Sequence, residues 1–534
     1  MTHQPDGSHP APSQAVAFAF VAGVEPLVGL QAAWIVGLIE QIFGDRPGMI
    51  TGATGALAVV MPPLTRPCQR GCDQPGEGQL TGCPLGAPVD EDGCVTPQFA
   101  SPEKLGLLFY AVILQGLIQL LCGFFKVGKL VSLLPHPVMV GFCNGLAIII
   151  GLAQFEGFKR GEMGPSNPLY CATMTQENAD FPESNIFATV LADEGAYMNY
   201  TVGDHCASVG RRQLGGGTAI FSDGHAWHDG QTLLFMILLL IIPTMITVHF
   251  LPKLLEKVVG NAQAVPSSLV AIALSMVIEH LILRSVDSDC DLVPDSILDV
   301  DGERSLWIGC GTKTVGEVAA VAGGFPVPIW FDTTTRPAYP GGPDVTLKSA
   351  LPAIDGEMLS TILPISIVLA AIGLIESLMT QQLVNGRTAT GGDPNRECIG
   401  QGMANVFAGA LGSMGGCAMI GQSMINVTSG GKLRISGIAA SLVLLMIILV
   451  ASPIIDLIPM GGLIGVMFMV VYYTFEWGSL KFIATVFLPE TTRTQAGLHT
   501  VKVNRADAIT VVIVTIVSTV HKQPALLYHD VVER

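Results

Sequence analysis

Polar residues that could bind an ion interrupt the apolar sequence between residues 376 and 437. The interruption contains a carboxylate, Glu376, with amides, hydroxyls and many glycines, and apolar blocks at residues 358–374 and 438–457 flank it. Polar backbone at membrane depth is tolerated only where it is buried in protein or lines a cavity. A carboxylate within a membrane span indicates a functional site. The pattern therefore predicts a polytopic transporter with its binding site in this stretch.

The composition indicates a chain that crosses a lipid bilayer many times. Of the 534 residues, 50% are hydrophobic and only 13% are charged, whereas soluble domains carry about 25% charged residues. Much of the net charge of −16 comes from long polar stretches, which we interpret as solvated acidic loops rather than as a cation-binding surface. Residues 1–13 lack the basic and apolar regions of a signal peptide. The first apolar segment would therefore direct its own insertion.

Apolar segments long enough to span or half-span the bilayer recur along the chain. A complete helical crossing needs about 20 residues, and segments 50–62 and 418–427 are shorter and broken by glycine. They are third and tenth in order, and such a matching pair is typical of an inverted repeat with a midplane binding site. The segments are residues 14–24, 27–43, 50–62, 106–124, 137–155, 233–251, 265–283, 359–380, 400–412, 418–427, 437–457, 461–475 and 507–520.

Lysine and arginine in alternate short connections predict which side of the membrane is cytoplasmic, because cytoplasmic connections carry an excess of these residues. They are Arg46; Lys126 and Lys129; Lys253 and Lys257; Arg387 and Arg396; and Lys432 and Arg434. Three polar loops with even numbers of cysteines are predicted on the opposite side of the membrane: Cys68, Cys72, Cys83 and Cys94; Cys171 and Cys206; Cys290 and Cys310. Even numbers favour disulfides formed outside the cytosol. We expect a multi-pass plasma-membrane protein whose cysteine-rich loops are extracytoplasmic.

Several motifs carry a resemblance to a known family. They are QAVAFAFVAGVEPLVGL (14–30), GMITGATGALAVVM (48–61), LPHPVMVGFCNGLAIIIGLAQF (134–155), TVGEVAAVAGGFPVP (314–328), NRECIGQGMANVFAGALGSM (395–414) and SGGKLRISGIAASLVLL (429–445). Together they resemble the sulfate permease (SulP) family of inorganic anion transporters over about residues 14–520. The resemblance implies an all-α polytopic membrane protein of two inverted seven-segment repeats, arranged as a core and a gate domain, and a homodimer.

The resemblance also implies a site between the half-helices of the third and tenth segments, whose N-termini meet near the bilayer centre. Helix N-termini carry about half a positive charge and bind anions without a cationic side chain. Glu376 and Thr380, at i and i+4 on one helix face, match the acidic residue and hydroxyl expected to couple Na⁺ or H⁺. The residues that match substrate-binding positions are Gln14, Phe18, Thr54, Gly55, Gly421, Gln422 and Ser423.

Some matched residues have plainer interpretations, and the chain departs from the family in places. Phe18 would serve for packing, Thr54 for a bond within its own helix, and Glu376 for a structural ion pair. Gln422 stands where mammalian relatives have arginine, which favours a cation-coupled symporter over an exchanger. Residues 1–13 are polar, and residues 521–534 form an atypical tail in place of a fourteenth span and a STAS domain. We therefore expect the 14–520 transporter domain to be incomplete at both ends.

Three functions stay open at this point. The resemblance favours a secondary active transporter of sulfate or bicarbonate, coupled to Na⁺ or H⁺; half-helix termini discriminate weakly between the two anions. A nucleobase permease has the same architecture, and Glu376 with Gln422 would supply its polar groups. A truncated, non-transporting homologue is the third. We expect no enzyme, nucleic-acid ligand, resident cofactor or metal site, because no catalytic set or metal-ligand spacing occurs at membrane depth. Asn405 is expected to bond another helix rather than substrate.

Overall fold

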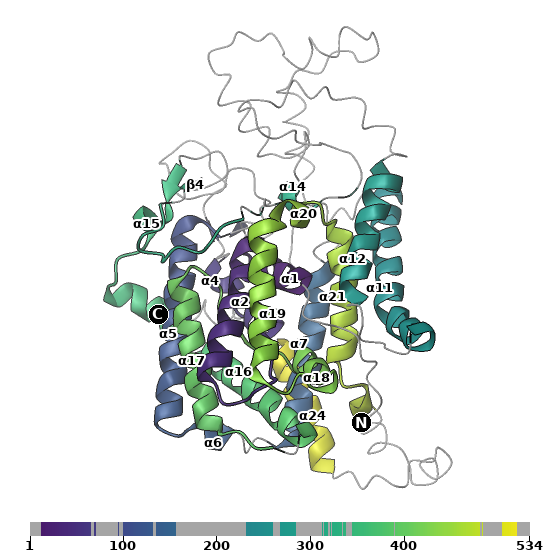
Figure 1. Cartoon of the computed structure of the whole chain (residues 1–534). Helices are drawn as coiled ribbons and strands as arrows, with labels where there is room; N and C mark the ends of the chain where they lie inside the picture. Colours follow the sequence, from purple (N-terminus) through teal and green to yellow (C-terminus); the bar gives the residue numbers. More distant parts are fainter. Residues whose placement is uncertain are drawn as a thin grey trace, which may run out of the picture.

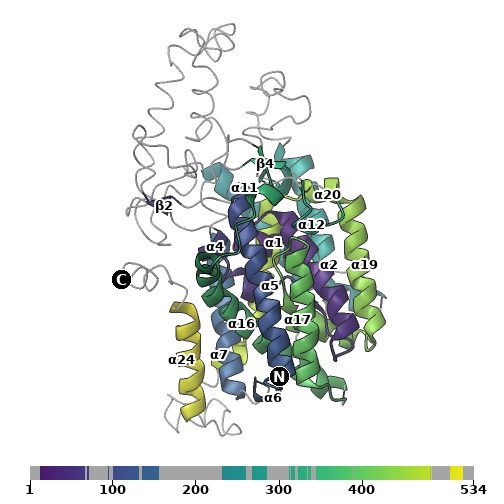
Figure 2. The ribbon, with the colours of Figure 1, turned by 90° about the vertical axis from the view of Figure 1, so that its left-hand side faces the viewer.

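The computed structural model of the chain describes residues 12–65, 69–70, 94–95, 100–131, 135–155, 231–259, 267–284, 351–388, 390–480, 483 and 505–520 and, with gaps, residues 312–350. The long helices in these ranges run roughly parallel to one another in two perpendicular views (Figure 1 and Figure 2). Seven of the eight cysteines of the three cysteine-rich loops lie outside the described residues, as does the atypical tail, 521–534, so the predicted disulfides stay a prediction.

Each long helix overlaps one of the predicted apolar segments. The helices are α1 (Pro12–Ala22), α2 (Pro26–Phe43), α5 (Pro102–Phe124), α7 (His136–Gln154), α11 (Gln231–Val259), α12 (Ser267–Val277, continued by a π-helical turn at Ile278–Leu283), α16 (Gly356–Thr388), α17 (Pro394–Ala410), α19 (Arg434–Val450), α21 (Met460–Thr474) and α24 (Arg505–Val520). Proline stands in the first turn of α2, α5, α7 and α17, where its missing N–H has no helical partner to lose. α16 runs beyond its apolar segment because protein, rather than lipid, buries Gln381 and Val384 in its last turns.

The described residues are mostly helical, and several of the helices are apolar enough for a multi-pass membrane protein, as predicted. Among the described residues, α2, α5, α7, α11 and α16 each contain a stretch that is long and apolar enough to cross a membrane. α19 is shorter, but its exposed side chains, which include Leu442, Val443, Met446 and Leu449, are apolar. Exposed apolar side chains along a whole helix face are expected where that face meets lipid.

The helices pack in two groups. In the first group, α17 packs against α5 and α2, α16 packs against α5, and α19 packs against α2. In the second, α11 packs against α12 and α21, and α7 packs against α21 and α24. Figure 1 shows α5 and α17 on one flank of the molecule and α11 and α12 on the other.

Glycines let α5 and α17 approach closely. A methyl group added to Gly402 would lie 2.6 Å from the backbone nitrogen of Leu120, and one added to Gly116 would lie 2.6 Å from that of Val406. Small residues permit such helix contacts within membranes. A hydrogen bond of 2.8 Å from Asn405 Nδ2 to Gln119 Oε1 joins the same two helices. The predicted interhelical bond of Asn405 is thereby confirmed.

The two glycine-broken segments form short strands that pair with each other. The third segment gives β1 (Thr51–Gly52) and α3 (Gly55–Ala58), and the tenth gives β6 (Cys417–Ala418) and α18 (Ile420–Thr428). β1 and β6 are antiparallel, with Thr51 opposite Ala418 and Gly52 opposite Cys417. The two short helices therefore leave this strand pair from opposite ends.

Basic residues from separate connections meet at one end of the bundle. Arg396 pairs with Asp45 at 3.4 Å, Arg46 donates to Thr390 Oγ1 at 2.9 Å, and Arg434 donates to the carbonyl oxygen of Gly44 at 2.6 Å. The short helix α6 (Gly128–Val131) contributes Lys129 at this end, which is the lower end in Figure 1.

The upper end in Figure 1 carries smaller elements. They are α14 (Val315–Val318), the hairpin of β4 (Thr335–Pro337) and β5 (Asp344–Thr346), α15 (Leu347–Ala350) and α20 (Ser452–Asp456). Three further short elements are α4 (Pro62–Thr65), β2 (Gln69–Arg70) and β3 (Cys94–Val95).

Candidate functional site

The candidate site surrounds the β1–β6 strand pair, where residues from α1, α16 and α18 converge on the start of α3. α18 has nine residues and begins after Met419, whose extended backbone carries the chain out of β6. α3 is a single turn of four residues that begins after Thr54. A longer helix aligns more peptide dipoles, so α18 supplies more of the positive potential at this site than α3 does.

Glu376 is joined to Thr54 through the thiol of Cys417. Cys417 Sγ lies 2.9 Å from Glu376 Oε2 and 3.0 Å from Thr54 Oγ1. All three side chains are buried: Cys417 is 0% exposed, Thr54 2% and Glu376 8%. The predicted cation-coupling residue on α16 and a predicted substrate residue at the start of α3 are therefore linked by hydrogen bonds through β6.

Gln14 and Gln422 bring α1 to the start of α18. The side-chain nitrogen of Gln422 donates a hydrogen bond to Gln14 Oε1, and both side chains are buried. Because Gln14 accepts in this bond, its own amide N–H groups are not used by it and can serve as donors to an oxyanion.

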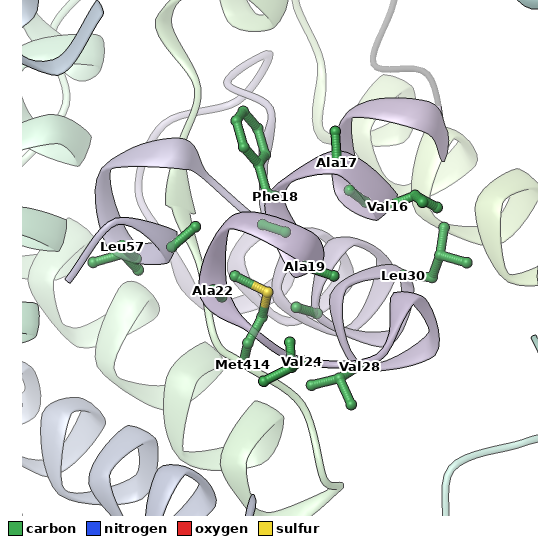
Figure 3. Close-up of a cluster of buried hydrophobic side chains, with 14 of the residues drawn as sticks. Val16, Ala17, Phe18, Ala19, Ala22, Val24, Val28, Leu30, Leu57 and Met414 are labelled. Carbon is green, nitrogen blue, oxygen red and sulfur yellow. The ribbon is translucent and has the colours of Figure 1, made fainter. Parts of the chain in front are cut away.

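Phe18 covers the start of α3. A methyl group added to Gly55 would lie 2.8 Å from Phe18 Cε1 and 2.4 Å from Ile150 Cδ1 of α7. Phe18 is thus packed against Gly55, and Figure 3 shows it beside the apolar residues of α1, with Leu57 of α3 nearby. In this structure the ring packs in the apolar core between α1 and α3.

Gly421, by contrast, faces open space. A methyl group added there would meet no atom within 4 Å. Ser423, two residues on, hydrogen-bonds to the backbone of Ile50: its Oγ accepts from the Ile50 nitrogen at 2.8 Å and donates to the Ile50 oxygen at 3.2 Å. Ser423 therefore holds α18 against the segment before β1, whereas Gly421 has room for a larger side chain.

Thr380 lies one turn after Glu376 on α16, but its hydroxyl does not bond to the Glu376 carboxylate. It donates to the main-chain oxygen of Glu376 at 2.8 Å. This bond still leaves lone pairs of the hydroxyl oxygen as acceptors, which is what a Na⁺ ligand requires.

A second set of buried polar side chains supports the strand pair from behind. Ser377 Oγ accepts from the nitrogen of Ala418 at 3.1 Å and donates to Gln401 Oε1 at 3.0 Å. Gln401 donates to the oxygen of Gly416 at 2.7 Å, and Asn405 Oδ1 accepts from the Gly416 nitrogen at 2.9 Å. These bonds satisfy buried backbone groups of β6 and fix its position between α16 and α17.

Cys417 is not among the site residues predicted from the sequence. The available signal was its place directly before the glycine-broken tenth segment, residues 418–427. Among the described residues, no three His, Cys, Asp or Glu side chains cluster so as to hold a metal ion.

Comparison with known proteins decides the family. The model of the sulfate permease family matches residues 12–192 and 346–492, which is more than half of the chain. The chain belongs to the sulfate permease family. The resemblance read from the sequence motifs is thereby confirmed, and membership argues against a nucleobase permease.

Individual members of the sulfate permease family are similar over most of the chain. YbaR of Bacillus subtilis (strain 168) is 29% identical over 474 residues, covering 88% of this chain and 65% of YbaR. The bicarbonate transporter BicA of Picosynechococcus sp. is 25% identical over 468 residues, covering 88% of this chain and 60% of BicA. The chain therefore spans less than two thirds of the length of these relatives.

Solved structures share the fold. The transmembrane domain of a cyanobacterial bicarbonate transporter BicA superposes with a TM-score of 0.59 at 21% identity, covering 96% of this chain and 92% of that chain. Murine Slc26a9, an anion transporter solved in the inward-facing state, gives a TM-score of 0.56 at 14% identity, covering 95% and 63%.

Proposed function

We propose that this protein is a secondary active transporter of an inorganic anion, sulfate or bicarbonate, coupled to Na⁺ or H⁺ through Glu376. The observation that carries the proposal is the meeting of α3 and α18 at the β1–β6 pair, beside Gln14, Gln422 and the buried Glu376. The family description and the name of BicA support the two anions.

The anion side of the site would use neutral donors. The N-terminal turn of α18 offers backbone N–H groups, and the amides of Gln14 and Gln422 and the hydroxyl of Thr54 lie around it. The open space at Gly421 is where we place the anion. A site without a positively charged side chain would bind its anion with moderate affinity, which suits a carrier that must also release the anion.

The cation side of the site would use Glu376. A charged carboxylate within a membrane costs about 2.5–3.5 kcal/mol on insertion scales. Na⁺ bound between Glu376 and the Thr380 hydroxyl, or a proton on Glu376, would offset that cost. Transport of the anion would be coupled to the cation if the protein changes between its two orientations fastest when both the anion and this cation are bound.

Movement between the two packing groups would give access from alternate sides. We assign α1, α2, α3, α5 and α16 to α19 to the core, and α7, α11, α12, α21 and α24 to the gate of two inverted repeats within residues 14–520. The end that carries Arg46, Arg396 and Arg434 would face the cytoplasm. We further propose a homodimer in the plasma membrane with the cysteine-rich loops outside.

Isotope uptake by vesicles that contain the protein tests this proposal. Labelled sulfate and bicarbonate are supplied separately, with and without Na⁺ and with and without a proton gradient. Accumulation of one of the anions that depends on one of the cations supports the proposal. Uptake equal to that of protein-free vesicles under every condition contradicts it.

A further inference from the structure

We propose that the Cys417 thiol couples protonation of Glu376 to anion binding at Thr54, by setting the direction of the hydrogen bonds that join these three side chains. The inference rests on the anion site proposed above. It assigns a positioning role to Cys417 and names the proton as the cation that acts on Glu376.

The geometry provides a continuous path of hydrogen bonds. Cys417 Sγ is within bonding distance of Glu376 Oε2, at 2.9 Å, and of Thr54 Oγ1, at 3.0 Å. The Thr54 side chain makes no capping bond to α3, although Thr54 is the residue that precedes the helix. Among the described residues, the hydrogen-bond partner of the Thr54 hydroxyl is Cys417 Sγ, so the hydroxyl hydrogen donates to no backbone oxygen and is available either to sulfur or to a ligand.

The protonation state of Glu376 decides which way the bonds point. An ionised carboxylate only accepts, and a thiol has a single hydrogen. When Glu376 is ionised, the thiol must donate to it, and the Thr54 hydroxyl then donates to the sulfur. In this state the Thr54 hydrogen is occupied, and the hydroxyl presents only lone pairs toward the anion site.

Proton uptake by Glu376 reverses the direction of these hydrogen bonds. The O–H bond formed on Glu376 donates to the sulfur, the thiol hydrogen turns to Thr54 Oγ1, and the Thr54 hydrogen is released toward the anion site. The proton that Glu376 binds is the only one added, and the thiol and hydroxyl only rotate. The anion site therefore gains a donor when the proton is bound, which is the coupling that a proton–anion symporter requires.

Other titratable groups near Glu376 do not replace this path. The Cys143 thiol of α7 also interacts electrostatically with Glu376, but it does not connect Glu376 to Thr54. α3 and α18 carry no titratable residue, and Arg396 and Glu397 of α17 contact Asp45. The other helices packed against α16 are α5 and α6, whose titratable residues are Glu103, Lys104, Tyr110, Cys122 and Lys129.

The test compares Cys417→Ser, which keeps a rotating donor, with Cys417→Ala, which removes it. Sulfate uptake by vesicles is measured from about pH 8 to about pH 5, and the fall in KM on acidification is compared between variants. Direct repulsion between charged Glu376 and the anion acts in both variants. The difference between their pH dependences of KM therefore reports the effect of the rotating donor at position 417 alone. Cys398→Ala, which removes a buried thiol of α17, is the matched control.

We expect wild type, Cys417→Ser and Cys398→Ala to show the same fall in KM. In Cys417→Ala the ratio of the KM at high pH to the KM at low pH should be about tenfold smaller than in wild type, which corresponds to about 1.4 kcal/mol of coupling. This smaller pH dependence should result from a lower KM at high pH, because without the thiol the Thr54 hydroxyl hydrogen is free at every pH. Equal pH dependence in Cys417→Ala and Cys417→Ser would overturn the inference, as would a wild-type KM that does not change with pH.

A binding measurement keeps the test independent of transport and folding. Stabilisation of the purified protein by sulfate, read as a shift in Tm, should depend less on pH in Thr54→Val than in wild type, as in Cys417→Ala. That variant should bind weakly at both pH values, the opposite of Cys417→Ala, whereas a purely structural role would weaken binding in both. If wild type neither binds nor transports sulfate or bicarbonate at any pH, the proposed function fails, and this inference with it.

Discussion

The side chain of Gln422 donates a hydrogen bond to Gln14, a residue 408 positions earlier in the chain. The bond joins α1 to the first turn of α18 and places two neutral amides at the start of that helix. In the proposed site the charge would come from helix ends and from Glu376, so that substitution at Gln422 would change it directly.

Gln422→Arg should shift selectivity toward the divalent anion. A full charge in a low-dielectric cleft attracts an anion more strongly than a dipole end, and a divalent anion gains about twice as much. Competitive uptake of sulfate against bicarbonate measures the shift, with an expected gain for sulfate of about tenfold. Gln422→Glu is the control with opposite charge and should disfavour sulfate. An unchanged preference in both variants would show that the anion lies elsewhere.

Glu376→Gln should make uptake independent of the coupling cation. The amide is neutral at every pH, and its N–H can donate to Cys417 as a protonated carboxyl would. Vesicle uptake with and without Na⁺, and over a range of pH, checks the expectation. Glu357→Gln, at the exposed start of α16, should retain the wild-type dependence. Wild-type cation dependence in Glu376→Gln would rule out this carboxylate as the coupling site.

The cysteine-rich loops should be extracytoplasmic and oxidised. Their even cysteine counts, on the side opposite the basic connections, motivate the expectation. Intact cells are treated with a membrane-impermeant thiol reagent before and after reduction. Labelling should appear only after reduction, whereas strong labelling without a reductant would contradict paired cysteines on the outside.

Gly402→Ala should destabilise the packing of α5 against α17. The added methyl group would lie 2.6 Å from the backbone nitrogen of Leu120, and overpacking of this kind costs about 1–3 kcal/mol. Gly386→Ala, where a methyl group meets no atom within 4 Å, should be neutral or stabilising by about 0.4–1 kcal/mol. Thermal unfolding in detergent compares the two, and equal Tm values would contradict the close helix contact.

The helices could be predicted because their signal is local. Apolar length and proline positions mark α2, α5 and α7 without any knowledge of the fold. The end of α16 was harder, since Gln381 and Val384 are buried by neighbouring helices that the local pattern does not reveal. Where tertiary packing replaces lipid, polar sequence can continue a helix that hydropathy would end.

The candidate site was predictable only in outline. Glycine-broken segments indicated two half-helices, but the pairing of Thr51 with Ala418 is a contact between residues far apart in the chain, and two-residue strands leave no periodic signal. The bridging position of Cys417 follows from that pairing. Likewise, the i, i+4 spacing of Glu376 and Thr380 does not reveal that the Thr380 hydroxyl bonds to the backbone.

The most direct test of the anion site is sulfate and bicarbonate uptake by Gly421→Leu, compared with wild type and Gly386→Leu. Both glycines face open space, so both variants should fold and reach the membrane at wild-type levels. The leucine at position 421 would occupy the space at the N-terminus of α18 in which we place the anion. The account predicts that Gly421→Leu loses uptake of both anions while Gly386→Leu retains it. Normal uptake by Gly421→Leu would contradict an anion site between α3 and α18.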